Sequence, residues 1–242
     1  MSTDRVLLEV CAESLDYAMA AERGGADRIE LSSALALGGI TPGVETMEAA
    51  REALGVPVHI LVRPRAGDFV YSGTEFETMR NDIEVVKRLR FDGVVTGVLD
   101  REGAIDVERT GELVELAWPL EVTFHRAFDE CPDFAQALEQ AIKTGARRIL
   151  TCGSRTQRAA DGLDGLRSLV KAAAGRIQIM PGGGIRANNL LRIVKGTGAR
   201  EVHSSAGALE VTNSGCATRS DAVFESRVQE LAKLLDELAA QS

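Results

Sequence analysis

Residues 122–129 read VTFHRAFD, a short β-branched and aromatic run that ends in three polar side chains, His125, Arg126 and Asp129. A run of this kind is typical of a buried strand that opens into a loop. The pattern PDFAQALEQAIKTG that follows predicts a helix from about Asp133 to Lys143. The segment therefore forms one unit of strand, polar loop and helix.

The same unit recurs along the whole chain. Strands are predicted at residues 6–11, 27–32, 56–65, 93–99, 122–125, 147–152, 176–181 and 200–205, and helices at about 14–25, 44–54, 75–90, 105–117, 133–143, 162–175, 188–198 and 221–241. Strands that are almost continuously apolar and alternate with helices indicate an α/β protein with a parallel sheet and right-handed crossovers.

Eight such units in a chain of this length favour a closed (β/α)8 barrel of the TIM type, formed as a single domain by residues 1–242. An open, doubly wound sheet is the alternative fold. The polar segment 206–220 is predicted to be a long loop after the last strand.

The composition excludes several classes of partner. A net charge of −8 argues against nucleic acid and anionic membrane surfaces. No apolar run approaches the ~20 residues that a membrane-spanning helix needs. The cysteines show no CxxC spacing, so we expect a cytoplasmic protein without a disulfide framework, in which most cysteines are small core residues.

Polar side chains gather at the predicted carboxyl ends of the strands, where barrels of this type carry their working groups. They are Glu9, Cys11, Glu30, Ser32, Arg63, Arg65, His125, Arg126, Cys152 and His203. The first, second and eighth strands are neighbours in a closed barrel, so Glu9, Glu30 and His203 are predicted to share one rim. The alternative is a structural layer of ion pairs inside the barrel, made by Glu9, Glu30, Arg28 and Arg63, because unpaired buried charges are costly.

The stretch MPGGGIRAN, residues 180–188, places Gly182, Gly183 and Gly184 between a strand and a helix. Glycines there let backbone N–H groups approach an anion, and a following helix N-terminus favours negative charge. We expect a phosphate or another anion at this loop, with a plain tight turn as the alternative; a dinucleotide site is disfavoured because its fingerprint belongs in an early βαβ unit.

Arginines are better placed than lysines to hold a ligand. Arg63, Arg65 and Arg126, with Asp129 beside them, are predicted to bind a carboxylate or phosphate, although pairing with nearby acidic residues explains them equally well. The lysines all fall in predicted helices, which disfavours a Schiff-base aldolase.

A series of motifs in these same segments resembles the CutC copper homeostasis family. The motifs are LEVCAES (8–14), GGADRIELSSAL (24–35), GGITP (38–42), RPRAGDFVYS (63–72), VTFHRAFD (122–129), RILTCG (148–153), MPGGGI (180–185) and EVHSSA (201–206). The resemblance implies a TIM-type barrel, a cytoplasmic homo-oligomer (a dimer or tetramer) and a role in copper homeostasis with Cu(I) as the ligand.

The resemblance also implies thiolate ligands at the ends of the first two strands. The first position matches Cys11, whereas the second falls on Ser32. Because linear Cu(I) prefers two soft donors, Cys152, Met180 or a second chain would have to replace the missing thiolate.

Two further functions compete with copper binding. One is an enzyme of the acid/base isomerase or lyase type that acts on a small phosphorylated or carboxylated metabolite, with catalytic groups among Glu9, Glu30, His125 and His203. The other is a scaffold that works only through partner contacts, which the gathering of charges on one rim disfavours.

Overall fold

The computed structural model describes residues 5–156, 158–207 and 221–241 of the chain. Its parallel strands are β1 (Leu7–Ala12), β2 (Arg28–Leu31), β3 (Val58–Leu61), β4 (Gly93–Thr96), β5 (Glu121–Phe124), β6 (Arg148–Thr151), β7 (Gln178–Pro181) and β8 (Glu201–Ser204). The α-helices are α1 (Leu15–Arg23), α2 (Val44–Ala53), α3 (Gly73–Arg88), α4 (Val107–Ala117), α5 (Phe134–Lys143), α6 (Leu163–Ala173), α7 (Ala187–Thr197) and α8 (Asp221–Ala239).

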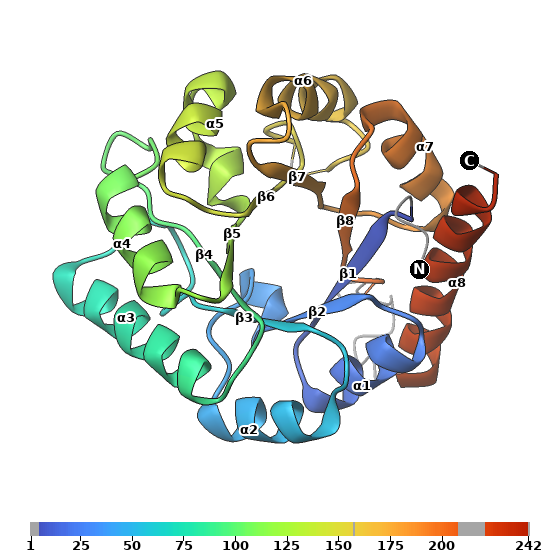
Figure 1. Cartoon of the computed structure of the whole chain (residues 1–242), viewed down its shortest axis with the longest axis horizontal. Coiled ribbons are helices and arrows are strands. Elements are labelled where there is room, and N and C mark those ends of the chain that lie inside the picture. The colour runs from blue at the N-terminus through green and yellow to red at the C-terminus, as the bar shows by residue number, and fades with distance from the viewer. Residues whose placement is uncertain (1–4, 157, 208–220, 242) are drawn as a thin grey trace.

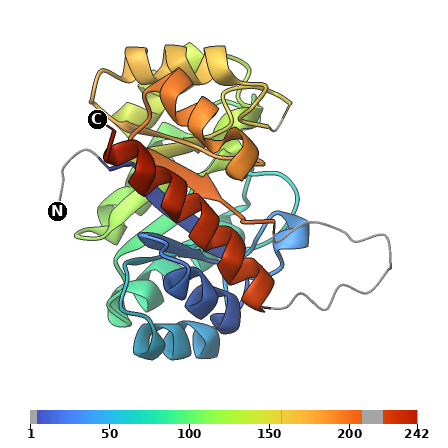
Figure 2. The ribbon, with the colours of Figure 1, turned by 90° about the vertical axis from the view of Figure 1, so that its right-hand side faces the viewer.

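The strands form a nearly closed barrel surrounded by the helices (Figure 1). They are paired in the order β7-β6-β5-β4-β3-β2-β1-β8, and β7 lies next to β8 where the two ends of this order meet. Figure 2 shows α8 running across the outside of the barrel, where it packs against α1 and where Arg23 pairs with Glu225. The predicted (β/α)8 barrel is confirmed, and the open sheet is not adopted.

Local sequence sets where the helices start. Asp133 caps α5 by accepting hydrogen bonds from the N–H groups of Ala135 and Gln136, and Ser72 forms a capping box with Glu75 at the start of α3. The structure adds two short 3₁₀ helices that the sequence analysis did not predict, η1 (Leu35–Leu37) and η2 (Arg126–Glu130). Most of the predicted loop at 206–220 lies outside the described residues. None of the described helices is long and apolar enough to cross a membrane.

The lower part of the barrel interior is filled by charged side chains rather than by apolar ones alone. Arg28 Nε lies 2.5 Å from Glu9 Oε2, and Arg28 Nη2 lies 2.6 Å from Glu201 Oε2. Arg148 continues the network with bonds of 2.9 Å to Glu201 and 2.6 Å to Glu121. We call these five residues the ionic floor. They match the predicted ion-pair layer for Glu9 and Arg28, whereas Glu30 and Arg63 lie elsewhere.

His59 of β3 is also buried inside the barrel, against a strand position that has no side chain. A Cβ atom added to Gly93 would lie 2.5 Å from the imidazole ring, so glycine makes room for it. Burial lowers the pKa of His59 to about 3, which keeps the ring neutral at pH 7.

Replacing Arg28 with methionine should destabilise the fold strongly, because the buried Glu9 would lose its arginine partner and Glu201 would be left with Arg148. We expect the free energy of unfolding to fall by about 3–5 kcal/mol in urea denaturation. Arg176→Met, which breaks an exposed pair with Glu139, serves as the control and should cost far less. Equal losses of unfolding free energy in the two variants would show that the ionic floor contributes no more to stability than an exposed ion pair.

His59 should make the fold sensitive to acid. Below about pH 6.5 the unfolded chain takes up a proton at this residue while the folded chain does not until about pH 3, so stability is lost as the pH falls through that window. The stability of His59→Gln should therefore decline less steeply than that of the wild type, by up to about 1.4 kcal/mol per pH unit for one proton. Urea titrations at pH 7, 6, 5 and 4 measure this; parallel curves would contradict it.

Candidate functional site

A cavity of about 430 Å³ opens at the carboxyl end of the barrel, above the ionic floor. Eight of the residues predicted from sequence line it: Cys11, Glu30, Arg63, His125, Arg126, Gly183, Gly184 and His203. Arg158 and Arg186 also line it. Arg186 stands within the glycine stretch quoted from the sequence, whereas nothing in the sequence marks Arg158, which precedes α6.

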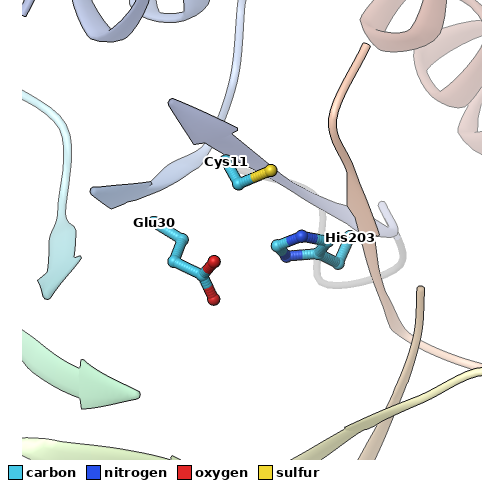
Figure 3. A group of neighbouring side chains, drawn as sticks. All are labelled: Cys11, Glu30 and His203. Carbon is cyan, nitrogen blue, oxygen red and sulfur yellow. The ribbon is translucent and has the colours of Figure 1, made fainter. Parts of the chain in front are cut away.

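Cys11, Glu30 and His203 form a compact group on one side of this cavity. They belong to β1, β2 and β8, and Figure 3 shows their side chains directed toward one another. Their ligand atoms all lie within 4.8 Å of one another, and all three residues are buried. The register of the strands brings these side chains together. Cys11 of β1 is paired with Glu30 of β2, and Glu9, two residues earlier on the same face of β1, is paired with His203 of β8.

Glu9 fixes the orientation of the His203 ring. Its Oε1 lies 2.8 Å from Nδ1 of His203, while its other oxygen is held by Arg28. Burial opposes ionisation of Glu9, but the charge of Arg28 and the hydrogen bond with His203 outweigh it and hold the pKa of this carboxyl below its usual range. Glu9 therefore positions His203 without belonging to the group itself. Because Nδ1 of His203 is bonded to Glu9, Nε2 is the ring nitrogen available to Cys11 and Glu30.

The protonation states of His203 and Glu30 depend on each other. Burial alone would lower the pKa of His203, but the charge of Glu30 and the hydrogen bonds with Cys11 and Glu9 hold that pKa well above its usual value. Burial raises the pKa of Glu30 to about 7, despite the opposing charge of His203. One oxygen of Glu30 is buried without a hydrogen-bond partner. Glu30 can thus gain or lose a proton near neutral pH.

Of the residues predicted to bind an anion, some line the cavity and others do not. Arg65 pairs with Asp68 and Glu75 away from the cavity. Arg126 lines the cavity, and its Nε lies 2.8 Å from Asp129. Asp129 itself is buried and also accepts bonds from Thr151 and the Cys152 N–H, so it supports the loop instead of lining the cavity.

The three glycines have different roles. Gly183 and Gly184 line the cavity with φ values of 99° and 69°, which favour glycine. Gly182 is needed for packing, because an added Cβ would lie 2.4 Å from Leu150 Cδ1. The loop then leads into α7 as the sequence analysis expected.

The alternative soft donors do not lie in the cavity. The Cys152 thiol lies 2.9 Å from the carbonyl oxygen of Ser154, and Met180 Sδ accepts a bond from Arg28 in the floor. Ser32 is buried and is not among the described residues that line the cavity. Cys11 is the only cysteine among the described residues that line the cavity, and Cys216 lies outside the described residues.

Known proteins share both the sequence and the fold of this chain. The family model described as the CutC family matches residues 6–208. A family protein CutC from Xanthomonas campestris pv. campestris is 48% identical over 199 residues, which are 82% of each chain. A copper homeostasis protein cutC homolog from Homo sapiens is 46% identical over 200 residues, 83% of this chain and 73% of the human one.

Solved structures agree with these matches. The putative copper homeostasis protein CutC from Streptococcus agalactiae superposes with a TM-score of 0.79 and 34% identity, covering 83% of this chain and 98% of that one. Thiamine phosphate pyrophosphorylase from Pyrococcus furiosus, with a TM-score of 0.62, 18% identity and coverage of 97% and 98%, shares the fold alone. The motifs at the strand ends, the barrel and these relatives agree, and the chain belongs to the CutC family.

Proposed function

We propose that this protein serves copper homeostasis by binding Cu(I) at the mouth of the barrel, with Cys11 and His203 as ligands. The relatives named copper homeostasis proteins support the general role. The observation that carries the specific proposal is the buried group of Cys11, Glu30 and His203 at the base of an open cavity.

The donor set fits a soft or borderline metal ion. A thiolate is the preferred ligand of Cu(I), and an imidazole nitrogen is an accepted second donor. The ion would replace the proton on Nε2 of His203, while Nδ1 keeps its bond to Glu9, an arrangement typical of metal-bound histidines. His203 thus takes the place of the donor that the family carries at the position of Ser32.

Glu30 widens the range of ions that the site can accept. A set of Cys, His and carboxylate donors with an open side also suits Zn²⁺. We therefore treat zinc as the competing ion in the test below. The location in the cytoplasm and the assembly into a dimer or tetramer stay predictions from the family resemblance.

A second candidate is an enzyme that acts on a small anionic metabolite. The observation that favours it is the Glu30 carboxyl, whose pKa of about 7 suits a general acid or base, facing a cavity lined by several arginines. Glu30 would then exchange a proton with the substrate and His203 would serve as the acid, while Glu9 only holds His203 in place.

Replacing Cys11 with serine should remove the soft ligand and weaken Cu(I) binding. We expect the wild type to take up one equivalent in an anaerobic titration against a chromophoric Cu(I) chelator, and Cys11→Ser to bind at least about tenfold more weakly. Cys131→Ser is the matched control, since that buried thiol contacts the carbonyl oxygen of Ala127 and lies outside the cavity. Affinity unchanged in Cys11→Ser would refute the proposal, and stronger binding of Zn²⁺ than of Cu(I) would reassign the metal.

Restoring a thiol at position 32 should strengthen binding. Ser32→Cys would place a second thiolate at the end of β2, and two soft donors suit linear Cu(I) better than one. The same titration should show a lower dissociation constant for Ser32→Cys than for the wild type. Equal constants would mean that position 32 cannot reach the ion bound at Cys11.

A further inference from the structure

Arg63 is a buried cation with no carboxylate partner. Only 5% of the residue is exposed. Its Nη1 donates to the carbonyl oxygens of Leu37 and Gly39, at 3.2 and 2.8 Å, and its Nη2 donates to that of Gly67 at 2.6 Å. Its Nε has no hydrogen-bond partner among the described residues. Among those residues no carboxylate forms an ion pair with Arg63, although its charge acts at longer range on Glu130, so a bound anion would stabilise the buried guanidinium further.

His125 lines the same cavity and carries a second donor that has no hydrogen-bond partner among the described residues. Its Nδ1 accepts a hydrogen bond from the N–H of Ala127 at 3.3 Å, so the ring proton is on Nε2. Nε2 is buried and has no partner. Burial and then the charge of Arg63 lower the pKa of His125 to about 3, which keeps the ring neutral.

Phe69 contacts the side chains of both Arg63 and His125. Its ring centroid lies 4.8 Å from that of His125, and the Arg63 guanidinium carbon lies 4.8 Å from the centre of the same ring. All three residues line the cavity. On the other side of His125, an added Cβ at Gly97 would lie 2.9 Å from Nδ1, which leaves the ring little freedom to move. The two donors are therefore fixed before any ligand arrives.

We propose that Arg63 Nε and His125 Nε2 bind the carboxylate of a small organic acid. A ligand oxygen would satisfy both unused donors and neutralise the buried guanidinium at once. This proposal deepens the second candidate function and rests on it for the chemistry at Glu30, but it does not depend on copper.

The charge of the pair favours a carboxylate over a phosphate. At these two donors Arg63 supplies one positive charge and the neutral His125 supplies none, so a monoanionic carboxylate is matched there. The carbonyl contacts of Arg63 explain how the side chain is held. They leave its Nε without a hydrogen-bond partner among the described residues.

The remainder of the acid would extend toward Cys11, Glu30 and His203, which line the same cavity. A cavity of about 430 Å³ is in the range of sites for small metabolites.

The first experiment measures ligand binding by metal-free wild-type protein. Acetate, pyruvate, malonate and inorganic phosphate are added at matched ionic strength, with chloride as the reference, and the melting temperature is followed. We expect at least one carboxylate to raise it above the chloride value and to titrate calorimetrically to one site, with phosphate no better than chloride. No response to any carboxylate, or a response to phosphate alone, would overturn the proposal.

The second experiment uses variants matched in shape. His125→Asn keeps an acceptor for the Ala127 N–H and removes the distal donor, so it should bind the carboxylate at least about tenfold more weakly. His125→Gln places an amide N–H near the position of Nε2 and should recover part of the affinity. Arg63→Gln should also weaken binding, and Arg65→Gln, outside the cavity, should not. If Arg63→Gln does not fold, the two His125 variants decide, and wild-type affinity in His125→Asn would refute the site.

Two controls separate this proposal from the functions proposed above. Cys11→Ser should bind the carboxylate as the wild type does while losing Cu(I), so failure of either result leaves the other intact. Deuterium exchange of the pyruvate methyl protons, followed by NMR, tests the enzyme candidate. Binding without exchange supports the carboxylate site and shows that pyruvate is not a substrate of the enzyme candidate, whereas exchange that is insensitive to His125→Asn argues against the site.

Discussion

The ion pair between Arg28 and Glu9 is the interaction on which the rest of the barrel interior depends. Arg28 keeps Glu9 ionised in a dry environment, and the second oxygen of Glu9 sets the orientation of His203. Without the cation, a carboxyl group in this place would take up a proton and would no longer hold the imidazole through a charged hydrogen bond. Barrels of this type are usually filled by branched apolar side chains. Here the charged floor and the site above it are built from the same residues.

The cavity divides into two chemically different walls. The wall formed by β8, β1 and β2 carries sulfur, nitrogen and carboxyl donors within 4.8 Å of one another, a composition that suits a metal ion or a proton transfer. The wall formed by β3 and β5 carries a fixed cation and a neutral ring N–H, a composition that suits an anion. The fold alone selects neither chemistry, because the same barrel serves many functions. The side chains at the strand ends make the difference.

Much of this arrangement could be predicted from sequence, and the limits have a physical cause. Alternation of apolar strands and amphipathic helices fixes the order of elements, and the adjacency of the first, second and eighth strands correctly brings Glu30 and His203 to one rim. Prediction failed for Arg65 and Asp129, which lie beyond the strand ends and do not line the cavity. β3 stops at Leu61, so strand periodicity no longer governs Arg65, which pairs with Asp68 and Glu75 away from the cavity. Strand periodicity also could not predict the supporting role of Asp129. Its hydrogen-bond partners are Thr151 at the end of β6 and the N–H of Cys152, the next residue.

The glycines on and just after β4 have a consequence for how this protein can evolve. Gly93 leaves space for the ring of His59, and Gly97 leaves space for the ring of His125. Two imidazoles from the neighbouring strands thus occupy volume that the inward side chains of β4 would fill in an ordinary barrel. A larger residue at either glycine would displace a ring before it added any packing. These two glycines have no functional side chain, yet their positions are among the least free to vary. A larger residue should be tolerated at Gly93 only if His59 is lost, and at Gly97 only if His125 is lost.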